Sequence, residues 1–177
     1  MKRIYANYLF KKSQRICRGF TLIEIVVASA LLMTVTVVGI ANFNRYSEAQ
    51  KIKNTAMDLS LMLQKARSRA QSQVKPSSIS TCQENSLKGY EVRLCNGLEL
   101  SCPVGNSYGL YVHCGTSIEL IDVKKLPDQV SFGNGSDTSF YFEVLKGTVS
   151  EGAIVLVAGN TQKTIAINNL GGITILE

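Results

Sequence analysis

The chain has 177 residues and a formal net charge of +6, and this length allows one globular domain with an additional element. The excess charge lies at the start, where residues 1–19 contain no acid and six basic residues, Lys2, Arg3, Lys11, Lys12, Arg15 and Arg18. The other residues carry 13 basic and 13 acidic side chains, so the net charge gives no evidence that they bind nucleic acid.

A membrane-length apolar segment follows this basic leader. Residues 20–41 contain one charged side chain, Glu24, and no proline. As a helix rising about 1.5 Å per residue, they can cross a hydrocarbon core of about 30 Å. A basic segment before such a span is typically held on the cytoplasmic side, and an acid within the span is by default a functional residue. We predict a transmembrane helix over residues 20–41 with a functional Glu24.

The helix is predicted to continue as an amphipathic segment over residues 42–75. Neither proline nor glycine occurs between residues 42 and 73, and apolar residues recur every three or four positions along one stripe: Ile52, Ala56, Leu59, Leu63, Ala66 and Ala70. This period is typical of a helix that packs one face on a folded domain. Pro76 is expected to end the helix.

Residues 76–177 are predicted to form an extracytoplasmic β domain. The hydrophobic period changes to two after Pro76, which indicates strands. We expect them at residues 77–82, 89–95, 108–114, 117–123, 130–132, 139–144, 153–158, 163–168 and 172–176. Turn residues such as Gly159-Asn160 favour hairpins, so the last three strands should form an antiparallel meander. Because the connections are too short for crossover helices, the expected fold class is α+β, a long N-terminal helix followed by a mainly antiparallel β-sheet domain.

Four of the five cysteines, Cys82, Cys95, Cys102 and Cys114, lie in the predicted extracytoplasmic part. An oxidising compartment favours disulfides, and four cysteines allow three pairings. Strand geometry slightly favours Cys95 with Cys102, which leaves Cys82 with Cys114. The alternative is four free and mostly buried thiols. Zinc is disfavoured because there is no C-x-x-C pair and the lone His113 adjoins Cys114.

The β domain carries no motif for catalysis. The sequence contains no phosphate-binding loop, no zinc-protease motif and no nucleophile elbow. Its single histidine, His113, lies in a predicted strand and is expected to be structural. Three scattered acids, Asp122, Asp128 and Asp137, do not form a calcium-loop pattern. We therefore expect neither enzyme activity nor a bound metal or cofactor.

The junction of leader and span carries a recognisable sequence, Arg18-Gly19-Phe20-Thr21-Leu22-Ile23-Glu24. It resembles the class III signal of type IV prepilins and type II secretion pseudopilins. More loosely, the layout of a long helix followed by a β domain ending in residues 165–175 is similar to minor pseudopilins of the GspH/FimT type.

The resemblance implies a pathway of processing and assembly. A prepilin peptidase would remove residues 1–19 by cutting between Gly19 and Phe20, and it would methylate the new amine of Phe20. Glu24 would then pair with an N-terminal amine and set the register of the subunit in a filament. The implied partners are other pilin or pseudopilin subunits, the prepilin peptidase, the inner-membrane assembly platform and the membrane itself.

The resemblance also implies a location and a subtype. The chain would cross the cytoplasmic membrane once, with its C-terminal domain outside, and would later lie in a periplasmic or cell-surface filament. Residues 38–42 lack the proline of many major pilins, and the calcium loop of the major pseudopilin is missing, which favours a minor subunit. Residues 168–177 contain neither lysine nor arginine, which argues against nucleic-acid binding.

Other readings of the N-terminus explain less. A secretory signal peptide predicts a shorter apolar run without an acid, and an uncleaved anchor does not account for Gly19-Phe20 together with Glu24. The rival function is a single-pass, membrane-tethered binding module, such as an adhesin or a DNA-uptake component, that is not built into a filament. Which system uses the subunit (secretion, adhesion, motility or DNA uptake) stays open at this stage.

Overall fold

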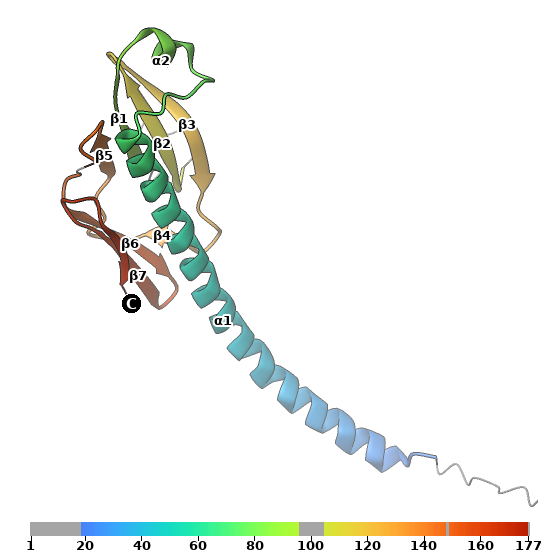
Figure 1. The fold of residues 1–177 in the computed structure, drawn as a ribbon. Helices are drawn as coiled ribbons and strands as arrows, with labels where there is room; N and C mark the ends of the chain where they lie inside the picture. The colour runs from blue at the N-terminus through green and yellow to red at the C-terminus, as the bar shows by residue number, and fades with distance from the viewer. Residues whose placement is uncertain (1–18, 96–104, 148, 177) are drawn as a thin grey trace, which may run out of the picture. The chain divides into compact units, whose positions relative to one another are not determined.

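The computed structural model describes residues 19–95, 105–147 and 149–176, without the side chains of residues 37–42, 44 and 45. The chain divides into two compact units, residues 1–42 and 43–177. Helix α1 (Leu22–Gln71) contains residues of both units, and the other elements belong to the second (Figure 1). This order of a long N-terminal helix followed by a mainly antiparallel β domain confirms the predicted α+β fold. Apart from Gly19, the predicted leader lies outside the described residues.

Helix α1 ends in a hydrogen-bonded cap and not at the proline. The amide of Gln73 donates to the carbonyl of Ala70 (3.4 Å), and the amide of Val74 donates to the carbonyl of Arg69 (3.2 Å). Gln73 has a φ of 54°, so a left-handed residue follows the helix and the last carbonyls are satisfied. Because this cap ends the helix several residues earlier, Pro76 is not the residue that stops it.

The strand predicted at residues 77–82 is wrong, because a short helix, α2 (Ser80–Glu84), occupies this segment. The side chain and the amide of Asn85 both donate to the carbonyl of Thr81, at 2.9 and 3.2 Å. Such local bonds from short polar residues compete with sheet formation. Cys82 is buried in α2.

The first sheet, sheet A, has the order β3-β2-β1-β5 with antiparallel pairing throughout. Its strands are β1 (Leu87–Cys95), β2 (Ser107–Cys114), β3 (Ser117–Lys125) and β5 (Ser139–Glu143). The two faces differ, because adjacent side chains alternate across a sheet. One face is apolar and buried, with Tyr90, Val92, Leu110, Val112, Phe140 and Phe142. The other face, called the outer face below, carries Glu91 opposite Tyr111 on β2 and Tyr141 on β5.

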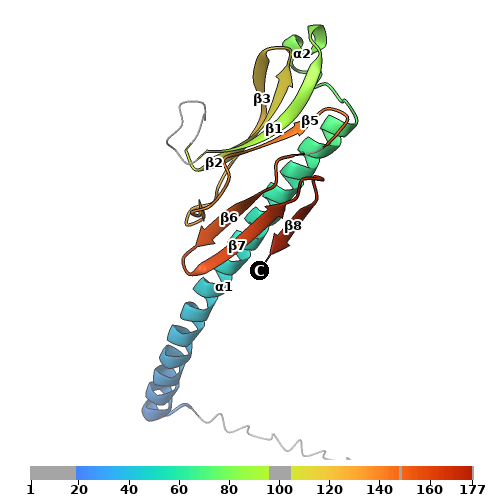
Figure 2. The ribbon, with the colours of Figure 1, turned by 90° about the vertical axis from the view of Figure 1, so that its left-hand side faces the viewer.

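The second sheet, sheet B, has the order β4-β6-β7-β8 and is also antiparallel. It consists of β4 (Ser131–Phe132), β6 (Gly152–Ala158), β7 (Thr161–Ile167) and β8 (Ile173–Leu176). The last three strands lie side by side (Figure 2), which confirms the predicted meander. Ala158 pairs with Thr161, so Gly159-Asn160 forms the tight turn of a hairpin, where Gly159 adopts a φ of 55°.

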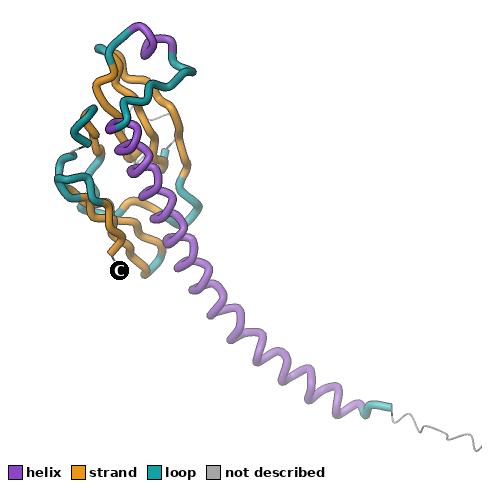
Figure 3. The backbone as a smooth tube through the Cα atoms, in the orientation of Figure 1, coloured by secondary structure: helices purple, strands orange, loops and turns teal. Residues whose placement is uncertain are grey.

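Within the second unit, α1 and the two sheets share one hydrophobic core. The predicted stripe is confirmed, because all its members have exposed fractions of 0%: Ile52, Ala56, Leu59, Leu63, Ala66 and Ala70. They belong to the same buried cluster as side chains from both sheets, and α1 lies beside both sheets (Figure 3). Two surface ion pairs, Lys65–Asp122 (3.4 Å) and Lys124–Asp58 (3.5 Å), also join α1 to β3. Because these pairs are exposed, apolar burial contributes most of the stability.

Candidate functional site

The N-terminal motif folds into a capped first helical turn. The amide of Glu24 donates to the side-chain hydroxyl of Thr21 (3.3 Å) and to its carbonyl (3.1 Å). Thr21 is thus the N-cap of α1, and Glu24 is the third residue of the helix, the spacing of a T-x-x-E capping box. A carboxylate in the first turn also interacts favourably with the positive end of the helix dipole. Glu24 stands out in the sequence as a lone acid in an apolar segment, whereas the capping role of Thr21 becomes visible only in the backbone geometry.

The surface around this turn is apolar and open. Exposed fractions are 79% for Phe20 and 81% for Leu22, and other large apolar side chains of the same unit are also more than half exposed: Ile23, Ile25, Val26, Val27, Leu31, Leu32, Met33 and Val35. A Cβ atom added to Gly19 would meet no heavy atom within 4 Å. Nothing described in the chain itself therefore requires glycine at position 19.

Among the described side chains after Glu24 in this helical segment, the hydroxyls are satisfied by their own helix. The hydroxyls of Ser29, Thr34 and Thr36 donate to backbone carbonyls three or four residues earlier, at 2.7 to 2.9 Å. The apolar surface thus carries one carboxylate and otherwise little free polar bonding capacity.

Within the described part of the chain, no helix is both long enough and apolar enough to qualify as a membrane span. The predicted span, residues 20–41, includes residues 37–41, whose side chains lie outside that part.

The cysteines of the β domain are oxidised wherever they are described. A disulfide joins Cys82 in α2 to Cys114 at the end of β2, which agrees with the favoured pairing and contradicts four free thiols. Cys95 is also disulfide-bonded, while Cys102, its expected partner, lies outside the described residues. The bond holds the segment after α1 against sheet A.

His113 belongs to a charge network on the outer face of sheet A. The Oε2 atom of Glu91 lies 2.7 Å from Nε2 of His113 and 2.8 Å from Nη2 of Arg93. The Arg93 guanidinium lies 4.9 Å from the centre of the Tyr111 ring, and the His113 ring packs edge-on against Tyr141 at 4.9 Å. We call these five residues the sheet A network.

The charge of Glu91 is stabilised inside this network. Burial alone would raise the pKa of Glu91, but the hydrogen bonds with His113 and Arg93 and their charges outweigh burial and lower the pKa to about 2. Because each of the five side chains contacts another member, the geometry favours a structural role for His113. Among the described residues, no group of three or more potential ligands is placed to hold a metal ion.

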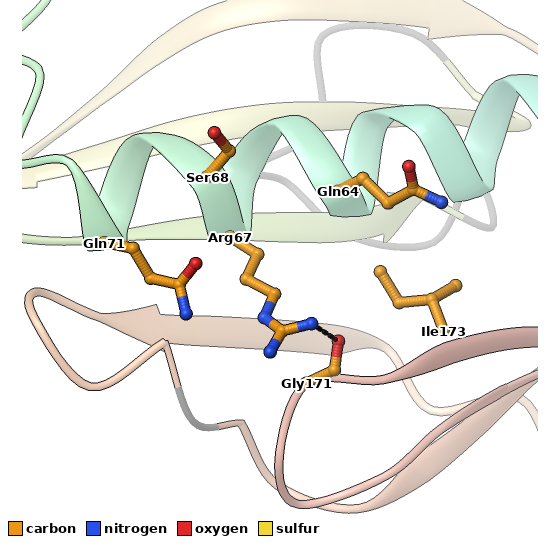
Figure 4. A pocket seen from close by; sticks show the side chains of 6 residues that line it. All are labelled: Gln64, Arg67, Ser68, Gln71, Gly171 and Ile173. Carbon is orange, nitrogen blue, oxygen red and sulfur yellow. Dashed lines mark hydrogen bonds between the residues drawn. The ribbon is translucent and has the colours of Figure 1, made fainter.

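A surface pocket lies between α1 and the loop that precedes β8 (Figure 4). Arg67 reaches from α1 into this pocket, and its Nη1 donates to the carbonyl of Gly171 (2.8 Å). The Nε of Arg67 is buried and has no hydrogen-bond partner among the described atoms. A Cβ on Gly171 would lie 2.8 Å from that Nε and 2.6 Å from the carbonyl oxygen of Gly147. The guanidinium is therefore packed tightly beneath the turn, an arrangement that fastens the last hairpin to the helix.

Comparison with known families identifies the N-terminal segment. Residues 14–40 match the family model of the prokaryotic N-terminal methylation motif. No curated protein and no solved structure matches the chain significantly. The family match includes Gly19, Phe20, Thr21 and Glu24, the residues of the capped first turn and its junction with the leader.

The motif points to a class of protein. A methylation motif at residues 14–40, followed by a long helix and an antiparallel β domain, supports a type IV prepilin-like or pseudopilin family. The motif supports a type IV pilin-like substrate of prepilin peptidase and implies assembly with other pilins.

Proposed function

We propose that the protein is a minor pilin or pseudopilin, a structural subunit of a type IV pilus or of a type II secretion filament. Residues 20–41 would anchor it in the cytoplasmic membrane, with residues 76–177 outside. The observation that carries this proposal is the capped first turn, where Glu24 stands exposed on an otherwise apolar helical surface. Such a surface needs apolar partners, first lipid and then the helices of like subunits.

Processing is proposed to occur between Gly19 and Phe20, followed by methylation of the Phe20 amine. A Cβ added to Gly19 would meet no heavy atom within 4 Å, so an enzyme could approach the backbone closely there, and a side chain would hinder that approach. Removing residues 1–19 also removes six of the basic residues. The charge that holds the precursor on the cytoplasmic side is then lost.

Assembly is proposed to depend on pairing of Glu24 with the N-terminal amine of a neighbouring subunit. An ion pair in hydrocarbon offsets the cost of burying each charge, and it fixes register more than it adds stability. Methylation retains the positive charge of the amine, so it is compatible with the pair. The platform in the inner membrane would draw the processed subunit into the filament.

The first experiment examines the N-terminus of the mature protein. Mass spectrometry of material from cells with an active prepilin peptidase should show a chain that begins at methylated Phe20. Gly19→Val should block cleavage, whereas Gly135→Ala, at a site with no heavy atom within 4 Å of the added Cβ, should not. An intact Met1 in wild-type protein would refute processing and favour the tethered binding module.

The second experiment examines assembly. Glu24→Leu should leave the subunit in the membrane fraction and deplete it from sheared filaments. Thr34→Val is the matched control, since it removes one polar group whose hydroxyl is already satisfied within the same helix. Normal incorporation of the Glu24→Leu protein would show that the carboxylate does not guide assembly.

A further inference from the structure

Two exposed aromatic side chains stand at the start of the second unit. Phe43 and Tyr46 each have an exposed fraction of 68%, and their three-residue spacing places them on one face of α1. They line a shallow depression together with Ser47, Gln50, Lys51 and Asn54. Phe43 and Tyr46 are called the aromatic pair below.

Within the described part of the β domain, the buried core does not include the aromatic pair. The buried stripe of α1 begins later, at Ile52, and the Tyr46 hydroxyl makes no hydrogen bond with another described residue. The same helix face becomes polar within two turns, where the side chains of Gln50 and Asn54 bond to each other (3.3 Å). Lys51 bonds instead to Gln129 of the domain (3.1 Å). The aromatic pair therefore marks a boundary between an apolar and a polar stretch of the helix.

The position of the pair matches a bilayer dimension. The helical residues of the first unit, Leu22 to Asn42, rise by about 30 Å at about 1.5 Å per residue, and the hydrocarbon core of a bilayer is about as thick. Phe43 is the next residue. Tyrosine is enriched at the membrane–water boundary because its ring is apolar and its hydroxyl reaches the headgroups.

We propose that the aromatic pair lies at the boundary between acyl chains and phospholipid headgroups on the extracytoplasmic side and fixes the depth of the membrane-bound subunit. This inference rests on the proposed membrane insertion of residues 20–41. The occupant of the depression is then a lipid headgroup region, with Phe43 at the acyl side and the Tyr46 hydroxyl among the headgroups.

The chain contains no tryptophan, so a single tryptophan reports its own position without background. The test uses the full chain in vesicles of phosphatidylethanolamine and phosphatidylglycerol, with added phosphatidylcholine brominated near the glycerol or near the acyl-chain end. Phe43→Trp and Tyr46→Trp are the probes. Leu31→Trp reports the interior of the proposed span, and Leu61→Trp is the matched control, because Leu61 is 59% exposed on the same helix face, further along.

If the proposal is right, lipid brominated near the glycerol (shallow) should quench tryptophan at positions 43 and 46 about twofold more than lipid brominated near the acyl-chain end (deep). Leu31→Trp should show the reverse order, and Leu61→Trp should be quenched by neither but by aqueous iodide. Leu61→Trp is needed as a control because tryptophan itself favours the membrane interface. Quenching of tryptophan at position 61 by brominated lipid would show that the substitution draws the helix into the membrane.

Failure of this inference and failure of the proposed function give different results. If Leu31→Trp is deep but positions 43 and 46 behave like position 61, the aromatic pair is aqueous and the inference is wrong while insertion stands. If positions 43 and 46 are as deep as position 31, the boundary lies elsewhere and the inference is also wrong. If Leu31→Trp escapes both brominated lipids, membrane insertion itself is refuted.

Discussion

Replacing Glu91 with glutamine tests the charge network on sheet A. The carboxylate is nearly buried, with an exposed side-chain fraction of 9%, against 23% for Arg93 and 21% for His113. Its pKa falls from an ordinary value of 4.5 to about 2 in the folded protein, because burial, which would raise it, is outweighed by the hydrogen bonds and electrostatic interactions with His113 and Arg93. A group with a lowered folded pKa stabilises the fold above its unfolded pKa and loses that contribution as the pH falls through the folded pKa.

The magnitude follows from the size of this shift. At about 1.4 kcal/mol per pKa unit, the charge of Glu91 can contribute at most about 3 kcal/mol to the free energy of unfolding. Because both partners are partly exposed, we expect a contribution of about 1–2 kcal/mol. Glu91→Gln keeps the shape and an accepting oxygen but removes the charge. The variant should therefore be less stable by this amount at pH 5 and above, and the difference should nearly vanish near pH 2.

The assay is urea unfolding of the full chain in detergent, followed by circular dichroism across this pH range. Glu143→Gln is the control, since Glu143 lies on the same sheet and pairs with Lys146 (2.8 Å) in an exposed geometry, with side-chain fractions of 49% and 64%. It should change the unfolding free energy by less than about 0.5 kcal/mol. A Glu91→Gln protein as stable as wild type at pH 5, or destabilised equally at pH 2 and pH 5, would refute the electrostatic reasoning.

Other changes test packing, the disulfide and the caps. Leu63→Ala should destabilise the domain by about 2–5 kcal/mol because Leu63 is fully buried, and Leu61→Ala on the exposed face should cost less than about 0.5 kcal/mol in the same urea assay; similar losses would contradict the assignment of the two faces. Replacing Cys82 and Cys114 together with alanine should remove about 2–4 kcal/mol, and an unchanged urea midpoint would show that the bond does not stabilise the fold. Gly171→Ala should cost about 1–3 kcal/mol from its positive φ and its close neighbours, and more than Gly135→Ala, which shares the positive φ but has open space. Thr21→Val should speed amide hydrogen exchange in the first turn of α1 by about fivefold through loss of a cap of about 1 kcal/mol, whereas Thr36→Val should leave that turn unchanged.

Local patterns in the sequence predicted most of the fold. The stripe from Ile52 to Ala70 and the alternation in the last three strands depend on residues close in sequence, and both were predicted. The strand predicted at residues 77–82 is wrong because a short polar helix and a short strand have similar sequence patterns. The hydrogen bonds of Asn85 to Thr81 favour the helix. Local sequence patterns do not determine which residues of neighbouring strands lie opposite each other. The contact between Glu91 and His113 on β2 therefore could not be predicted from the sequence.

The candidate sites differ in whether their residues are close in sequence. The motif around Glu24 is contiguous and is therefore visible in the sequence, although the capping role of Thr21 is visible only in the backbone geometry. Arg67 is different, because its partner Gly171 is 104 residues away and Arg67 lies outside the apolar stripe. A single arginine on a helix does not indicate a contact with a distant turn, because most arginines lie on protein surfaces without such a contact.

The shared core of α1 and the two sheets has a mechanical consequence for a subunit under load. A pull on α1 along its axis would act in shear on the interface formed by Ile52, Leu59 and Leu63, where many apolar contacts must break together. Arg67 ties α1 to the Gly171 turn, and the Cys82–Cys114 bond ties the segment after α1 to β2, so both would resist slip of the helix. Tension would thus be distributed over the whole β domain before any one strand could peel away.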